Sequence, residues 1–186
     1  MKRVILIHGW GGNPDEAWMP HLKRTLAQRG FEIVAPQMPD TDTPRIASWV
    51  AKVTELIGTP GSDTHFVGHS VGCQAIMRAI AALPEGSRVG HVVLVAPWFN
   101  LTEEGGKGGA EEKPWLETPI DTDAVRRNTE DITAIFSDDD PLVPLSDAEL
   151  FRERLDAHIV VEHGMGHMSG DSGITELPSA LMSFRK

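Results

Sequence analysis

The sequence predicts a three-layer α/β fold, with a central six-stranded, mostly parallel sheet and helices on both of its faces. Three observations lead to this prediction. Short apolar runs alternate with segments of helical periodicity along the 186 residues. The runs contain almost no alternating polar positions, which is typical of parallel strands that are covered on both sides. Glycine, proline and aspartate gather in the connections between them.

Six apolar runs are the predicted strands. They cover residues 4–7, 31–35, 65–67, 91–96, 132–136 and 159–161. Helical spacing of apolar residues, or a proline at a first helical position, predicts the helices between them. These helices begin at Pro20, at Thr43-Pro44 and after Ser70, and cover residues 123–128, 146–155 and 177–184. Because a connection between parallel strands is usually a helix, the alternation predicts helices on both faces of the sheet.

Composition and charge narrow the class of function. The length fits a single domain, residues 1–186, that is large enough to bury a core. The net charge is −10 and no cluster of lysine and arginine is present, so we expect neither a nucleic acid nor a membrane surface as partner. The single cysteine, Cys73, cannot form an internal disulfide, and no secretory signal or membrane span is evident. We therefore expect a cytoplasmic protein.

The residues around Ser70 predict a nucleophile. Gly68-His69-Ser70-Val71-Gly72 follows an apolar strand directly and precedes a helical pattern. G-x-S-x-G between a strand and a helix is the nucleophile elbow, a turn so sharp that the backbone of the serine is strained. The glycines leave room where a side chain would strike the neighbouring elements. The hydroxyl then stands at a helix N-terminus, where backbone N–H groups stabilise developing negative charge.

A serine hydroxyl needs a general base, and the base needs a carboxylate to orient it. In proteins built on this elbow the carboxylate follows a late strand and precedes the histidine in the chain. The run Asp138-Asp139-Asp140-Pro141 occupies that place. The spacing Asp-x-x-x-Pro favours Asp140 as the orienting acid, with Asp138 and Asp139 as alternatives that cap the turn.

The base is expected in the loop after the last strand. That loop reads His163-Gly164-Met165-Gly166-His167. His167 lies further out among the glycines and is favoured over His163, which directly follows the strand. His8 and His69 flank the site and are expected to shape it rather than to titrate in catalysis.

Backbone N–H groups and aromatic side chains complete the predicted site. The oxyanion formed in acyl transfer needs two N–H donors, which we assign to Val71 and to Trp10 in the glycine-rich loop after the first strand. Trp10, Trp98, Phe99 and Trp115 are the candidates to line an apolar substrate pocket. Packing in the core or in a lid is the alternative for each of them.

Residues 100–119 interrupt the alternation of strands and helices. They contain four glycines and five glutamates and are expected to form an irregular insert. Such an insert is either a lid or mobile binding loop, or an acidic surface loop without function. We expect no cofactor and no metal. A metal site of His163, His167 and the aspartates is disfavoured, because the glycines between the two histidines argue against a helix there.

Together these motifs resemble the α/β-hydrolase superfamily, and more narrowly the small serine hydrolase family typified by YdeN and retinoblastoma-binding protein nine. The resemblance rests on residues 8–14, 68–73, 139–144 and 166–167. It implies a minimal α/β-hydrolase fold without the early antiparallel strands of larger relatives. It also implies a Ser70–Asp140–His167 triad and esterase-type activity. The Leu-x-Cys-x-Glu element linked to retinoblastoma binding is absent, so that partner is not implied.

These inferences lead to two hypotheses about function. The first is a serine hydrolase that cleaves small carboxylic esters, a small-molecule substrate class, through an acyl-enzyme intermediate. The alternative is a protein-interaction module on a hydrolase fold whose catalysis is incidental, because fold and function can separate. A fluorophosphonate probe directed at reactive serines distinguishes them.

Overall fold

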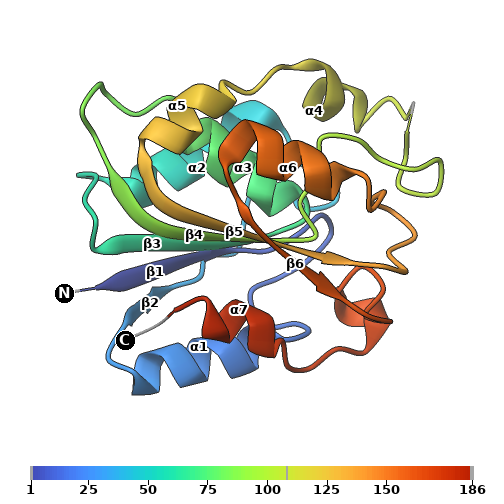
Figure 1. The fold of residues 1–186 in the computed structure, drawn as a ribbon, viewed down its shortest axis with the longest axis horizontal. Helices are drawn as coiled ribbons and strands as arrows, with labels where there is room; N and C mark the ends of the chain where they lie inside the picture. Colours follow the sequence, from blue (N-terminus) through green and yellow to red (C-terminus); the bar gives the residue numbers. More distant parts are fainter. Residues whose placement is uncertain (1, 108, 185–186) are drawn as a thin grey trace.

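Six parallel strands form one sheet between two layers of helices in the computed structural model, which describes residues 2–107 and 109–184 (Figure 1). Along the chain they are β1 (Arg3–Ile7), β2 (Glu32–Val34), β3 (Thr64–His69), β4 (Val89–Val95), β5 (Thr129–Ser137) and β6 (His158–Glu162). Their order across the sheet is β2-β1-β3-β4-β5-β6, and every neighbouring pair is parallel. The three-layer α/β class predicted from the sequence is confirmed.

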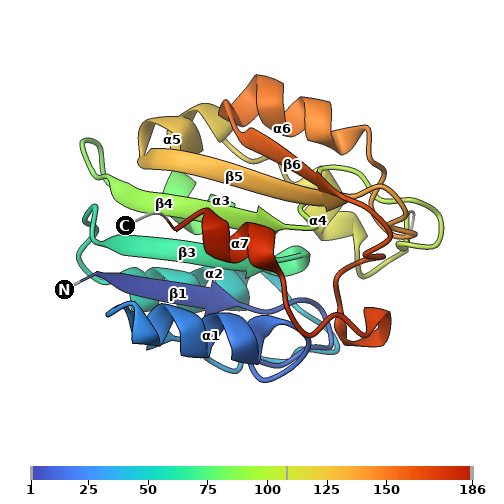
Figure 2. The same ribbon diagram turned by 60° about the horizontal axis from the view of Figure 1, so that its bottom comes forward.

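The helices cover both faces of this sheet (Figures 1 and 2). On one face lie α2 (Ile46–Ile57), α3 (Val71–Ala81), α5 (Thr122–Arg127) and α6 (Asp147–Leu155), and on the other lie α1 (Met19–Gln28) and α7 (Pro178–Met182). Each face has its own buried cluster, which contains Trp49 and Phe151 on the first and Trp18 and Leu22 on the second. In the described part of the chain, no helix has the length and apolarity needed to cross a bilayer.

The inner strands are apolar along nearly their whole length because helices cover both of their sides. All six residues of β3 are buried, as are four of five in β1 and six of seven in β4. The edge strands β2 and β6 have no fully buried residue. A strand that meets helices on both faces has no solvent side, so its polar positions disappear. This is why solid apolar runs identified these strands.

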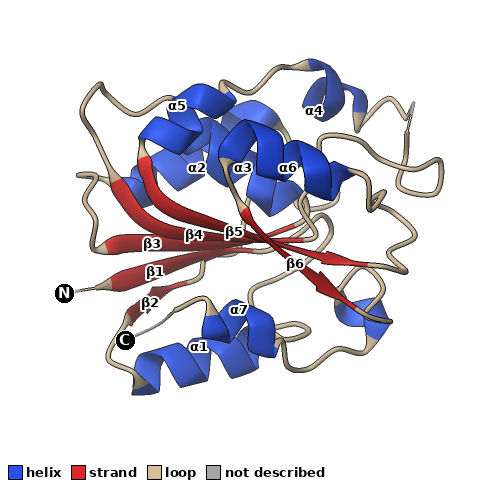
Figure 3. Ribbon diagram, viewed as in Figure 1, coloured by secondary structure: helices blue, strands red, loops and turns tan. Residues whose placement is uncertain are grey.

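Because every neighbouring pair is parallel, the carboxyl ends of all six strands lie at one edge of the sheet. Ile7 pairs with Gly68, and His69 pairs with Val95. Figure 3 shows the strand arrowheads pointing toward the same group of loops. Two further elements lie in these loops, α4 (Lys113–Glu117) and a short 3₁₀ helix (Gly170–Ser172). In parallel α/β sheets this carboxyl edge is where reactive groups collect.

Some boundaries differ from the sequence prediction. The helix expected to begin at Thr43-Pro44 begins at Ile46, because Arg45 still has extended backbone angles (φ −114°, ψ 136°). The insert over residues 100–119 is not wholly irregular, since it contains α4. The closing helix α7 is shorter than expected, because Leu177 is outside the helical region (φ −134°, ψ 84°) as the residue before a proline favours.

Candidate active site

Ser70 lies in a sharp turn between the end of β3 and the start of α3. Its backbone angles, φ 52° and ψ −121°, lie in a region that costs a non-glycine residue about 1–3 kcal/mol. Two glycines, which have no Cβ atom, permit the turn. A Cβ on Gly72 would lie 2.6 Å from the carbonyl oxygens of Ile7 and His8, and a Cβ on Gly68 would lie 3.0 Å from the backbone of α3. The G-x-S-x-G sequence is therefore required by close packing on both sides of the serine.

Three side chains from three loops form one hydrogen-bonded line. His167 Nε2 lies 2.9 Å from Ser70 Oγ, and His167 Nδ1 lies 2.8 Å from Oδ2 and 3.1 Å from Oδ1 of Asp140. An ionised carboxylate only accepts hydrogen bonds, so the Nδ1 proton is donated to Asp140 and Nε2 accepts from the Ser70 hydroxyl. The side chains of His167 and Asp140 are only 9% and 2% exposed. This arrangement can pass a proton from the hydroxyl to the imidazole.

Asp140 is the one member of the three consecutive aspartates whose carboxylate reaches His167. Its Oδ1 also accepts hydrogen bonds from the N–H groups of Leu142 (2.8 Å) and Val143 (3.1 Å). These donors hold the carboxylate in the turn after β5 and stabilise its negative charge. The geometry thus favours Asp140 over the two alternatives that the sequence left open.

Asp138 and Asp139 instead anchor the loop that follows β6. Asp138 accepts a 2.6 Å hydrogen bond from His163 Nδ1, which lowers the pKa of Asp138 and raises the pKa of His163. Asp139 accepts from the hydroxyl of Ser137 (2.7 Å) and the N–H of Gly166 (2.8 Å), and these two bonds lower its pKa. The His163 side chain is 83% exposed. Both aspartates therefore hold the loop in place without contacting the imidazole of the buried histidine.

The loop after β1 also contributes residues to the cleft. Trp10 and Val71 both line the cleft at the elbow, and their N–H groups make no hydrogen bond within residues 2–107 and 109–184. His8 holds this loop. Its Nε2 accepts from the N–H of Met38 (3.0 Å), so its Nδ1 carries the proton and donates to the carbonyl of Gly9 (2.8 Å). Burial lowers the pKa of His8, which favours this neutral form.

Comparison with known proteins identifies the family of the chain. A family model described as serine hydrolase matches residues 4–186. The chain belongs to this serine hydrolase family. It is 30% identical over 184 residues to the putative hydrolase YdeN of Bacillus subtilis, with 95% of this chain and 91% of that protein covered. It is 27% identical over 169 residues to the serine hydrolase RBBP9 of Rattus norvegicus, with 89% and 86% covered.

Solved structures extend the comparison to the fold. The crystal structure of the ydeN gene product from B. subtilis matches with a TM-score of 0.89 at 26% identity, covering 98% of this chain and 96% of that one. Est1E from Butyrivibrio proteoclasticus, in a structure with bound ferulic acid, matches with a TM-score of 0.69 at 16% identity, covering 91% and 82%. The latter likeness concerns the fold alone. The minimal α/β-hydrolase fold implied by the resemblance is confirmed.

In this serine hydrolase a second buried histidine supports the first. His69 Nε2 donates a 2.9 Å hydrogen bond to the backbone carbonyl of His167, and the two ring centroids are 5.1 Å apart. Trp18 packs edge-on against His69 at 6.2 Å. Burial lowers the pKa of His69 to about 3, so its imidazole is neutral at physiological pH. His69 is therefore built to position the loop of His167 rather than to carry a proton.

We expect the free energy of unfolding to fall as the pH drops below about 6.5, partly because of His69. Its pKa of about 3 in the folded state lies below the value of 6.5 expected when unfolded, so the unfolded chain binds the proton more tightly. The stability is fully present above pH 6.5 and is lost progressively toward pH 3. One such proton contributes a slope of about 1.4 kcal/mol per pH unit.

Urea unfolding at a series of pH values measures this slope. His69→Gln keeps an N–H donor for the carbonyl of His167 but cannot titrate. The dependence of the unfolding free energy on pH should therefore decrease by about 1.4 kcal/mol per pH unit, the contribution of one proton. The wild-type protein is the reference, because the other buried histidines contribute equally to both curves. Identical slopes for the two proteins would contradict this account of His69.

A cleft of about 310 Å³ opens beside Ser70 at the carboxyl edge of the sheet. Trp10 and Trp98 line it, as the sequence predicted, together with Leu101 and Leu142. These side chains give part of the wall an apolar character. The cleft leads directly to the hydroxyl and the imidazole, which is the position that a substrate carbonyl must reach.

Phe99 and Trp115 do not line this cleft, contrary to the sequence prediction. Phe99 stacks on Phe151, with ring centroids 4.4 Å apart. Trp115 is 2% exposed, donates its Nε1 proton to the carbonyl of Pro44 (3.0 Å) and packs edge-on against Trp49. Trp115 is therefore buried against α2, whereas Phe99 is half-buried and packs against α6.

Four carboxylate side chains line the cleft and were missed by the sequence analysis. They are Glu16, Glu104, Glu112 and Asp171. Among the described residues that line the cleft there is no lysine or arginine. The acidic composition of the insert was a signal for Glu104 and Glu112. For Glu16 and Asp171 no local signal existed, because only the tertiary fold brings their loops to the same opening.

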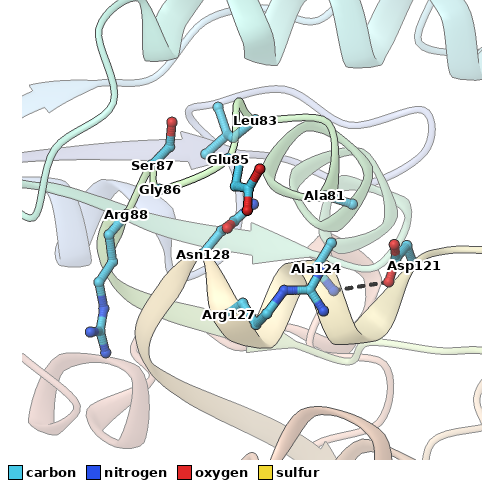
Figure 4. Close-up of a pocket in the computed structure, with 10 residues that line it drawn as sticks. All are labelled: Ala81, Leu83, Glu85, Gly86, Ser87, Arg88, Asp121, Ala124, Arg127 and Asn128. Atoms are coloured by element: carbon cyan, nitrogen blue, oxygen red, sulfur yellow. Dashed lines mark hydrogen bonds between the residues drawn. The ribbon is translucent and has the colours of Figure 1, made fainter.

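A second cleft, of about 830 Å³, lies at the far end of α3 from Ser70 (Figure 4). Its polar residues are Glu85, Ser87, Arg88, Asp121, Arg127 and Asn128. No histidine or cysteine is among the residues that line it, so Ser87 has no base there. Figure 4 shows the guanidinium groups of Arg88 and Arg127 pointing to different sides, so they do not converge on one anion. The smaller cleft, with its nucleophile and base, is therefore the candidate active site.

Proposed function

We propose that this serine hydrolase is a carboxylesterase that cleaves small carboxylic esters through an acyl-enzyme intermediate. The observation that carries the proposal is the hydrogen-bonded line from Ser70 Oγ through the imidazole of His167 to Asp140. We assign Ser70 as nucleophile, His167 as general base and acid, and Asp140 as the group that orients the imidazole. Acyl transfer requires these three roles in this order.

In the first half of the reaction, Ser70 Oγ forms a bond to the ester carbonyl carbon while His167 Nε2 takes the hydroxyl proton. The carbonyl π electrons move onto the oxygen, and we assign the N–H groups of Trp10 and Val71 as the donors that stabilise its charge. The tetrahedral intermediate then collapses and the bond to the leaving alkoxide breaks. The alkoxide takes the proton from His167, and the acyl group stays on the serine.

In the second half, a water molecule repeats the attack on the acyl-enzyme. His167 takes one proton from the water and returns it to Ser70 Oγ as the carboxylic acid leaves. Asp140 stabilises the imidazolium that forms in both halves, because its ionised carboxylate accepts the Nδ1 proton in a hydrogen bond. Atoms and charges therefore balance without a cofactor.

The size and lining of the cleft support a small acyl group. Its volume of about 310 Å³ is at the lower end of the range for small-molecule sites. Trp98, Leu101 and Leu142 offer apolar contact near the serine. A long apolar chain would also meet the four carboxylates that line the cleft, which disfavours it.

We expect esters whose acyl chain ends in a carboxylate to be poorer substrates than methyl-ended esters of the same length. The carboxylates that line the cleft repel a second negative charge, and a penalty of about 1.4 kcal/mol lowers kcat/KM roughly tenfold. Matched pairs of p-nitrophenyl esters measure the ratio. Added salt should reduce it, because mobile ions screen exposed charges. A ratio that does not respond to salt, or to Glu112→Gln, would contradict the electrostatic origin.

A fluorophosphonate probe and a series of p-nitrophenyl esters from acetate to octanoate test the proposed function. We expect labelling of the wild-type protein at Ser70 and the highest kcat/KM for the short acyl chains. Neither labelling nor hydrolysis of any ester would overturn the proposal. That result would favour the alternative of an interaction module on a hydrolase fold.

We also place the reaction in the cytoplasm. The one cysteine of the sequence, Cys73, is buried in α3, so the fold does not depend on an internal disulfide. Such independence suits a reducing compartment. Cell fractionation with an antibody against the protein tests this placement, and recovery outside the cytoplasmic fraction would contradict it.

A further inference from the structure

One segment, residues 98–107 and 109–119, contributes a large part of the lining of the cleft, and we call it the cap segment. It runs from the end of β4 to the approach to α5 and includes α4. Its contributions to the cleft are Trp98, Leu101, Glu104, Gly105, Gly106 and Glu112. The position of this segment relative to Ser70 therefore determines the shape of the space for an acyl group.

A buried arginine holds one end of the cap segment. Arg78 of α3 is only 8% exposed, and its guanidinium donates to the carbonyl oxygens of Thr118 (2.7 Å), Trp115 (3.1 Å) and Pro119 (3.2 Å). These carbonyls lie in and just after α4. The negative end of a helix favours a cation at this place. Within the part of the chain that the structure describes, no carboxylate offsets the charge, and burial lowers the pKa of Arg78.

Burial of the Arg78 guanidinium has an unfavourable free energy. A buried charge loses its hydration, and neutral carbonyl groups compensate for it less well than a carboxylate would. In addition, the buried Nε of Arg78 has no acceptor among the described residues. An apolar side chain of similar length would fill the same space without this penalty. What it would not supply is a fork of N–H donors that gathers three carbonyl groups at one point.

Gln74 connects this anchor to the other end of the cap segment. Its Oε1 accepts from Arg78 Nη2 (3.1 Å), and its Nε2 donates to the carbonyl of Trp98 (2.7 Å). Gln74 and Arg78 lie one turn apart on α3, the helix that begins immediately after Ser70. The same helix therefore begins directly after the nucleophile and binds both ends of the cap segment through Gln74 and Arg78.

We propose that Arg78 is a positioning residue that sets the acyl-group selectivity of the site by fixing the cap segment over the cleft. It touches neither the substrate nor the reacting atoms. It acts through the carbonyls of residues 115–119 and through Gln74. The kinetic consequence rests on the proposed esterase function, whereas the effect on the cap segment does not.

The middle of the cap segment has its own attachment, so loss of Arg78 should loosen the segment without unfolding it. The N–H of Thr102 donates to the carbonyl of Leu142 (3.0 Å), and its hydroxyl donates to the carbonyl of Pro141 (2.5 Å). Asp147 accepts hydrogen bonds from the N–H groups of Phe99 (2.6 Å) and Asn100 (2.8 Å). We therefore expect altered shape of the cleft and an intact elbow.

Arg78→Met and Arg78→Lys test the proposal, with Arg126→Met as the matched control because Arg126 is exposed on neighbouring α5. For Arg78→Met, we expect kcat on the acetate ester within about threefold of wild type. The ratio of kcat/KM between octanoate and acetate esters should change about tenfold. Hydrogen exchange should accelerate in residues 109–119 alone. Arg78→Lys should restore most of the wild-type ratio, since an ammonium group can still donate to the carbonyls.

Three outcomes would overturn the proposal. One is an unchanged ester ratio together with unchanged exchange. Another is an equal loss of activity on every ester, which would indicate damage to the elbow. The third is Arg126→Met behaving like Arg78→Met. If Arg78→Met does not fold, Gln74→Met breaks the same connection and is held to the same criteria. If the wild-type protein cleaves no ester, the proposed function fails, and the exchange data alone decide whether Arg78 fixes the cap segment.

Discussion

Ser70→Ala is expected to abolish ester hydrolysis, with a fall in kcat of about a millionfold. Alanine has no atom that can form the acyl bond, so only the weak effect of binding and oxyanion stabilisation remains. The substitution removes the 2.9 Å hydrogen bond to His167 but leaves the elbow glycines in place. We therefore expect a folded protein that a fluorophosphonate no longer labels. Initial rates on p-nitrophenyl acetate and the thermal midpoint Tm measure both consequences.

Ser169→Ala is the matched control for this experiment. Ser169 also lines the cleft, but it is not part of the hydrogen-bonded line to Asp140. Its substitution should leave kcat within a few-fold of wild type and labelling unchanged. Hydrolysis by Ser70→Ala above about one per cent of the wild-type rate would show that another group is the nucleophile.

Asp140→Asn is expected to lower kcat by about four orders of magnitude while leaving the fold intact. The amide can donate a proton to Nδ1 of His167, which favours the tautomer that carries its proton on Nε2. That tautomer cannot accept the proton of Ser70. The N–H groups of Leu142 and Val143 still find an oxygen acceptor, so the turn after β5 is retained. Steady-state kinetics on the acetate ester measure the loss.

The neighbouring aspartates provide controls with the same chemical change. Asp138→Asn and Asp139→Asn alter hydrogen bonds that hold the loop after β6, to His163 and Gly164 for Asp138 and to Ser137 and Gly166 for Asp139. We expect each to reduce kcat about tenfold or less. A similar loss for all three substitutions would mean that the run of aspartates acts through the loop backbone, and the role assigned to Asp140 would be wrong.

Local sequence was sufficient to predict the architecture because each signal is local in origin. A strand covered on both faces has no polar side, and solid apolar runs therefore identified the inner strands. The edge strands β2 and β6 were also recognisable as short apolar runs, although none of their residues is fully buried. The boundaries were less accurate, as at Ile46 and Leu177, where the backbone angles of one residue outweigh the apolar periodicity. The elbow was recognisable for the same local reason, since its glycines are required by atoms within the same turn and its two neighbours.

The choice among the acids and bases needed more than local information. Chain order and spacing favoured Asp140 and His167. In the structure the two ring nitrogens of His167 lie within hydrogen-bond distance of Asp140 and of Ser70. The sequence had no means to show that Asp138 and Asp139 hold the same loop by other contacts. Those contacts depend on the register between β5 and β6, in which Ser137 pairs with Glu162.

The order of the strands along the chain, the elbow and the types of residue available for acyl transfer could all be predicted from the sequence. Which side chains face the cleft depends on contacts between segments far apart in the chain, so it became visible in the structure alone. Phe99 packs against α6, Trp115 packs against α2, and Arg78 binds the carbonyls of the cap segment. Four carboxylates from three segments of the chain line the same cleft. This difference arises because the interactions involved act over different separations along the chain. Periodicity and turn chemistry act between residues close in sequence, whereas the direction of a loop side chain is set by packing against elements far along the chain.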